Sequence, residues 1–165
     1  MQKEIDKMGC IEIRNAVDTE NDAIHEILSE AFKPYRECYT EQAYVITVCS
    51  PEEIGQRIDD SMTDVLVAVY EDQIVGTATL HLREKGELYL SSMAVIPATQ
   101  GKGVGYYLLQ AVERRAKEKN CTVISLECCE FLRMAIGLYK RMGYKRTGRK
   151  RPYYGVEVFE MQKLM

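Results

Sequence analysis

A run of glycines between a predicted strand and a predicted helix has the residues to bind an anion. The segment Gln100-Gly101-Lys102-Gly103-Val104-Gly105 holds three glycines in five positions, with a lysine among them. Glycine lets the main chain turn several N–H groups toward one point, and a helix N-terminus adds about half a positive charge. Phosphate or pyrophosphate fits such a place. The segment predicts a phosphate-binding turn, with a tight turn without ligand as the alternative.

Two common phosphate-binding motifs do not match this segment. A P-loop reads G-x4-G-K-[ST], whereas Lys102 is followed by Gly103. The dinucleotide fingerprint G-x-G-x-x-G needs its third glycine at the position of Tyr106. The turn is therefore of a different type.

The apolar pattern around the turn predicts an α/β protein in which strands and helices position it. Ser50-x-x-Glu53 with Pro51 marks one helix start. Strands 65–70, 74–83 and 88–96 follow one another and predict an antiparallel meander. The remaining strands are expected at 11–17, 122–128 and 156–162, and the helices at 24–32, 50–61, 104–120 and 131–142, with 34–49 unassigned. Strands and helices together predict a layered sheet with helices.

Length and composition indicate one globular domain, residues 1–165. Hydrophobic residues make up 46% of the chain, and the formal net charge is −3, which argues against a nucleic-acid-binding surface. The longest apolar run, 65–70, is far below the ~20 residues that span a bilayer, and the N-terminus has no signal-peptide stretch. We expect a cytoplasmic protein that binds neither membrane nor nucleic acid.

The cysteines and histidines do not predict a metal site. Cys128 and Cys129 are adjacent, a spacing that bonds internally only under strain, and His25 and His81 lie on a predicted helix and strand. The other cysteines are scattered without C-x2-C spacing: Cys10, Cys38, Cys49 and Cys121. We expect reduced thiols and no metal.

Two ordered motifs resemble those of the GCN5-related N-acetyltransferases (GNAT family). Gln100–Gly105 fits [QR]-x-x-G-x-[GA], after an M-A-V-x-P strand at 93–97 and before an amphipathic helix. Residues 135–144 fit A-x-x-L-Y-x-x-x-G-[FY]. The resemblance covers roughly residues 65–165. The first 60 residues match only in the order of their elements, and in this family they shape the acceptor site.

The resemblance implies the GNAT fold and acetyl-CoA as co-substrate. The family has a mixed, mostly antiparallel sheet of six to seven strands and about four helices, with its fourth and fifth strands splayed into a V that holds coenzyme A. By position, the main chain at 93–95 pairs with the pantetheine arm, and 100–106 holds the pyrophosphate. The implied cofactor residues are Met93, Ala94, Val95, Gln100, Gly101, Lys102, Gly103, Val104, Gly105 and Tyr106.

The resemblance also implies catalytic residues. Tyr139 matches the tyrosine that protonates the leaving thiolate, and a phenol with a pKa near 10 is protonated at neutral pH. Glu127 lies twelve residues earlier, an offset similar to that of the glutamate base in ribosomal-protein and peptide α-amino acetyltransferases. Glu87, at the start of a strand, is the second candidate base. The alternative interpretation is that Tyr139 is an aromatic residue packed under the helix and that Glu127 and Glu87 are solvated carboxylates at strand ends.

Three features depart from the family pattern or add to it. Leu132 stands where the family usually has an asparagine that contacts pantetheine. Cys128 and Cys129 suggest an alternative mechanism through an acyl-cysteine intermediate, although direct transfer in a ternary complex is favoured. The run 145–151 holds five basic residues and is expected in a loop, where it binds an acidic substrate or the 3′-phosphate or is simply solvated.

The function implied is transfer of acetyl from acetyl-CoA to a primary amine of a small molecule or peptide. The alternative is a non-catalytic acyl-CoA-binding or sensing module. Tyr139 favours the enzyme, because a binding module needs no acid for a thiolate. The acceptor, the acyl-chain preference and a homodimer are left open by the sequence.

Overall fold

A computed structural model describes residues 4–5 and 11–165, which excludes Cys10. The described residues form one eight-stranded sheet in the order β1-β2-β3-β4-β5-β6-β8-β7. The strands are β1 (Glu4–Ile5), β2 (Ile11–Asn15), β3 (Thr63–Tyr70), β4 (Gln73–Arg83), β5 (Glu87–Val95), β6 (Val123–Cys128), β7 (Lys145–Tyr153) and β8 (Val156–Leu164). The α-helices are α1 (Asn21–Phe32), α2 (Glu41–Val48), α3 (Pro51–Asp59), α4 (Val104–Glu118) and α5 (Arg133–Arg141). The predicted α/β class is confirmed.

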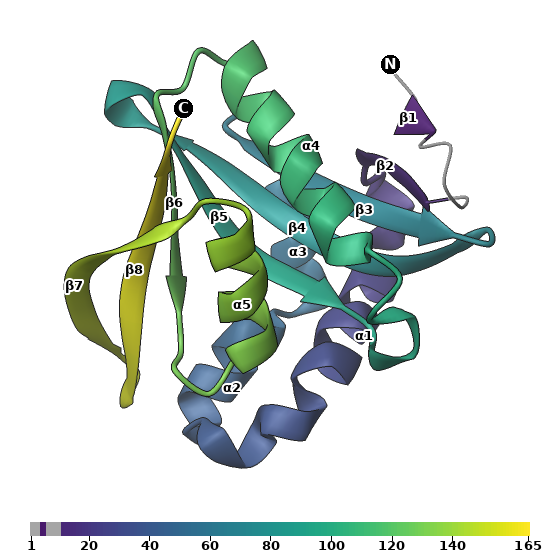
Figure 1. The fold of residues 1–165 in the computed structure, drawn as a ribbon. Helices are drawn as coiled ribbons and strands as arrows, with labels where there is room; N and C mark the ends of the chain where they lie inside the picture. The colour runs from purple at the N-terminus through teal and green to yellow at the C-terminus, as the bar shows by residue number, and fades with distance from the viewer. Residues whose placement is uncertain (1–3, 6–10) are drawn as a thin grey trace.

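The sheet is mostly antiparallel and opens in its middle. β3, β4 and β5 form the predicted antiparallel meander. β5 and β6, the predicted fourth and fifth strands, pair in parallel, and only over Glu87–Leu90 with Val123–Leu126. Beyond these residues the two strands diverge, as Figure 1 shows. The expected V is therefore present.

The helices cover both faces of the sheet. α4 and α5 pack on one face, and α1 and α3 pack on the other (Figure 1). Strand β3 contributes Leu66 and Ala68 to the first face and Val65 and Val67 to the second. This double burial explains why the strand reads as an unbroken apolar run rather than as an alternation.

The N-terminal helices show one confirmed start and one missed helix. α3 begins as predicted: the Glu53 N–H donates to Ser50 Oγ over 3.2 Å and the Glu53 carboxylate accepts from the Ser50 N–H, a capping box worth about 1 kcal/mol. The missed α2 lies in the unassigned stretch. Thr40 caps it, but its run of β-branched residues is a weak helix former. No helix in the described part of the chain is long and apolar enough to cross a bilayer.

The prediction that the basic run 145–151 lies in a loop is wrong. Residues 145–151 lie in strand β7, which pairs with β8 at the edge of the sheet. Charged residues on both faces hide the period-two pattern, so the sequence shows no strand signal there. Most of the charges are paired: Arg146 with Glu130, Arg149 with Glu160, Lys150 with Glu157 and Arg151 with Glu127. An edge strand rich in charge resists pairing with other chains.

Candidate active site

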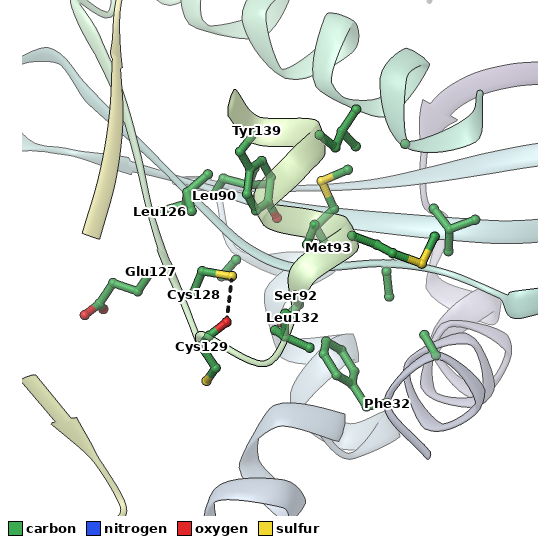
Figure 2. Close-up of a pocket in the computed structure, with 18 of the residues that line it drawn as sticks. Phe32, Leu90, Ser92, Met93, Leu126, Glu127, Cys128, Cys129, Leu132 and Tyr139 are labelled. Carbon is green, nitrogen blue, oxygen red and sulfur yellow. Dashed lines mark hydrogen bonds between the residues drawn. The ribbon is translucent and has the colours of Figure 1, made fainter. Parts of the chain in front are cut away.

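A cleft of ≈ 830 Å³ lies where β5 and β6 part. Its lining comes from β5 and the turn after it, from β6 and α5, and from α1, α3 and β7 on the other side. Figure 2 shows Tyr139, Met93, Leu132 and Cys128 around it. The cleft therefore joins the two motifs of the C-terminal half to the helices of the N-terminal half.

One end of the cleft is the N-terminus of α4. Gly103 is its N-cap residue, with φ +86°, and no side chain caps the helix. The first N–H groups of a helix have no partner inside it, so those of the first turn are open to an anion. Gly101 also has a positive φ, +84°, and both glycines line the cleft. The glycine run thus forms a turn into a helix, as predicted, and its binding of a phosphate stays a prediction.

Gly105 serves the packing of two helices. A Cβ built there would lie 2.8 Å from Leu138 Cδ2, so α4 and α5 approach closely at this point. Gln100, Val104 and Tyr106 line the cleft, and Gln100 Nε2 donates to the Val95 carbonyl over 3.2 Å. Lys102 is not among the lining residues.

The Lys102 ammonium lies 5.5 Å from the centre of the Tyr70 ring. Of the predicted cofactor residues, Lys102 is therefore the one whose side chain the structure directs elsewhere. Its place in the turn still gives the main chain its path between Gly101 and Gly103.

Strand β5 exposes its main chain to the cleft. Met93, Ala94 and Val95 line it, and they lie past Leu90, where pairing with β6 stops. Their β6-facing N–H and C=O groups are free of a neighbouring strand. Ser92 has φ +47°, and the pairing with β4 shifts register nearby. A bulge of this kind turns a strand and often lies beside a binding site.

Tyr139 lies in the cleft on α5. The residue is 7% exposed, and burial raises the pKa of its phenol, with the nearby Cys128, Tyr144 and Tyr89 adding to the shift. Its hydroxyl makes no hydrogen bond with another described residue. The phenol is thus protonated at neutral pH and has its O–H available to a ligand.

Glu127 lies in the cleft but points away from Tyr139 (Figure 2). The Arg151 guanidinium donates to both carboxylate oxygens, over 2.6 and 2.7 Å, and the Tyr89 hydroxyl donates over 3.2 Å. Burial and the Glu127 charge raise the pKa of Tyr89 to about 12, so this donor stays protonated. A carboxylate accepts about four hydrogen bonds, which leaves room for one more donor.

Glu87, the second candidate base, is not among the residues lining the cleft. Its carboxylate accepts from the Ser125 hydroxyl and lies 3.4 Å from the Arg83 guanidinium. The structure therefore brings Tyr139 and Glu127 to one cleft and leaves Glu87 outside it.

The cleft also contains polar residues that the sequence did not single out as site residues. Arg57, His81, Tyr89 and Tyr153 come from α3, β4, β5 and β7. Burial, with the charges of Arg57 and Arg83, lowers the pKa of His81, so its imidazole is neutral at pH 7. No local motif marks these residues, because they meet only when distant segments fold together.

Cys128 and Cys129 line the cleft and are buried. Burial raises the pKa of both thiols, that of Cys128 to about 12. The Cys128 thiol donates to the Cys129 carbonyl over 3.6 Å (Figure 2). Within residues 4–5 and 11–165, no group of three or more His, Cys, Asp or Glu residues is placed to hold a metal ion.

Comparison with known proteins shows the family. The model of the acetyltransferase (GNAT) family matches residues 21–144, and the chain belongs to this family. It is 37% identical over 97 residues to the probable N-acetyltransferase 14 of Xenopus tropicalis, covering 58% of this chain and 44% of that protein. It is 30% identical over 81 residues to the glucosamine 6-phosphate N-acetyltransferase of Candida albicans, covering 46% and 52%. The alignments thus span about half the length of these two curated relatives.

A solved structure shows the same fold. The crystal structure of the PaiA N-acetyltransferase from Thermoplasma acidophilum, in complex with coenzyme A, superposes with a TM-score of 0.80 at 21% identity. The superposition covers 94% of this chain and 99% of that one. The predicted GNAT fold is confirmed, with one helix, α2, and two strands, β1 and β7, more than the sequence indicated.

The buried thiols give a prediction about reactivity. At pH 8 a thiol with a pKa of about 12 is ionised in only about one molecule in 10⁴, and the thiolate is the reactive form. In a Cys10→Ser variant, a thiol reagent should therefore modify the exposed Cys38 quickly and Cys128 only after unfolding. Peptide mass spectrometry over time identifies the modified residue. Fast labelling of Cys128 in the folded protein would contradict the burial described here.

Proposed function

We propose that this protein transfers acetyl from acetyl-CoA directly to a primary amine of a small molecule or peptide. One observation carries the proposal: the opening between β5 and β6 leads to an uncapped helix N-terminus at one end and holds the Tyr139 hydroxyl along its length. Membership of the GNAT acetyltransferase family supports it. A sensing module would have no use for a phenol in this position.

The donor is proposed to lie along the opened edge of β5. Main-chain N–H groups at 101–106 would bind the pyrophosphate, because no side chain caps the helix and its N-terminus is the positive end of the helix dipole. The free edge of Met93–Val95 would pair with the pantetheine amides and polarise the thioester carbonyl. The similar PaiA protein is described in complex with coenzyme A.

The chemical step needs one base and one acid. The amine nitrogen attacks the thioester carbonyl carbon, an N–C bond forms, and the C–S bond breaks. Glu127 would take the proton from the amine, directly or through one water, and Tyr139 would give its proton to the departing sulfur. The high pKa of the phenol keeps this proton in place until the thiolate forms.

An acyl-cysteine intermediate is not favoured. It would require a Cys128 or Cys129 thiolate, and burial keeps both thiols protonated. Direct attack in a ternary complex needs no cysteine thiolate.

Replacing Tyr139 by Phe should lower turnover about 10²-fold, since general acid catalysis usually supplies that much. Binding of coenzyme A should change little, because the ring remains. Tyr144→Phe is the matched control: this tyrosine packs 5.8 Å from the Tyr139 ring, and its buried hydroxyl has no partner among the described residues. Thiol release and calorimetry are the measurements. Equal turnover in the two variants would contradict an acid role for Tyr139.

Replacing Glu127 by Gln should lower activity at neutral pH and let it recover partly at higher pH, where more of the amine is already deprotonated. Glu87→Gln should do less, because Glu87 lies outside the cleft. Glu127→Gln also removes the ion pair with Arg151, so Arg151→Gln is the control that removes the pair and keeps the carboxylate. A pH–rate profile is measured for each. If Arg151→Gln is as inactive as Glu127→Gln, the ion pair matters and the base assignment is wrong.

A further inference from the structure

Arg57 of α3 is a partly buried cation in the cleft with a neutral partner. Its Nη1 donates to Ser92 Oγ over 2.9 Å, and it forms no ion pair with a carboxylate in the described part of the chain. A guanidinium has five N–H donors, so most of them are left for a ligand. The Arg57 charge also acts on Glu53, one turn earlier on α3, but the two residues form no ion pair. A partly buried cation without an ion-pair partner is stabilised by a ligand that supplies the opposite charge.

The other arginines that line the cleft differ from Arg57. Arg151 forms an ion pair with Glu127, which is the only Asp or Glu among the described residues that line the cleft. Arg141 is exposed and belongs to α5, the helix that packs against the turn proposed to hold the pyrophosphate. Arg57 is therefore the cation that remains for a second ligand.

The position of Arg57 places it on the side of the cleft where the acceptor amine would bind. It bonds to Ser92 at the bulge of β5, next to the main chain proposed to hold the thioester, and its charge acts on His81 and Tyr153. α3 lies on the face of the sheet opposite α4 and α5 (Figure 1). A ligand entering from this face meets Arg57 beside a neutral imidazole, and the only Asp or Glu among the described residues that line the cleft is Glu127, which is paired with Arg151.

We propose that the acceptor carries, besides its amine, an anionic oxygen group, a carboxylate or a phosphate, and that Arg57 binds this group. The planar fork of arginine fits both groups through two parallel hydrogen bonds. This inference rests on the proposed acetyl transfer and names the class of its acceptor. It disfavours polycationic acceptors, because they would meet an unneutralised guanidinium.

The test uses acceptors in matched pairs that differ in the anion alone. Phenylalanine with phenylalaninamide tests the carboxylate, and glucosamine 6-phosphate with glucosamine tests the phosphate. Thiol release from acetyl-CoA gives kcat and KM for each. In at least one pair the anionic member should have a kcat/KM about 10- to 100-fold above the neutral one, the usual range for a hydrogen bond between charged groups. The pair that shows the preference tells carboxylate from phosphate.

Variants then assign the preference to Arg57. Arg57→Gln should raise the KM of the anionic acceptor about 10-fold or more and leave kcat/KM of its neutral partner unchanged, and Arg57→Lys should restore part of the loss. Arg36→Gln removes an equal charge from an exposed arginine outside the cleft and should change nothing.

Two results would overturn the inference, and they are distinguishable. If neutral and anionic acceptors react equally well and Arg57→Gln lowers kcat for all by one factor, Arg57 only supports the bulge at Ser92, and acetyl transfer itself stands. If no acceptor releases thiol with the wild-type protein, the proposed function fails and this inference falls with it.

Discussion

The parting of β5 and β6 is the constraint on which the rest of the structure depends. Their four paired positions hold the sheet together, and beyond Leu90 and Leu126 no strand of the described residues pairs with β5 on that side. Exposed N–H and C=O groups need partners, which here a ligand can provide. α4 and α5 cover one side of the opening and α1 and α3 the other, so that two molecules can approach it from opposite faces.

Charge is distributed unequally along this opening. At the proposed donor end, main-chain N–H groups and the helix dipole would bind the phosphates without a lysine, because the Lys102 side chain is directed toward Tyr70. The proposed acceptor end has Arg57, which forms no ion pair with a described carboxylate, and Glu127, which is paired with Arg151. In between, burial keeps Tyr139 and the thiols protonated. In this proposal, one cleft would hold anions at its two ends and has a proton donor between them.

The sequence predicts what is encoded locally. The glycine turn, the cap at Ser50 and the position of Tyr139 each depend on residues within one short segment, and all lie where expected. Among the missed elements, the β-branched run of α2 has no clear helical face, and the charges of β7 conceal the alternation of a strand. The contact of Arg57 with Ser92 spans 35 positions, so only the fold brings it about.

Hydrogen–deuterium exchange with and without coenzyme A tests most directly whether the opening holds the donor. Binding should slow exchange of the amides at 101–106 and of those in β5 after Leu90, because both sets would gain hydrogen bonds to the ligand. The edge strand β7 should exchange at the same rate in both states. If calorimetry shows coenzyme A bound while the amides at 101–106 exchange unchanged, the pyrophosphate lies elsewhere and the proposed donor site is wrong.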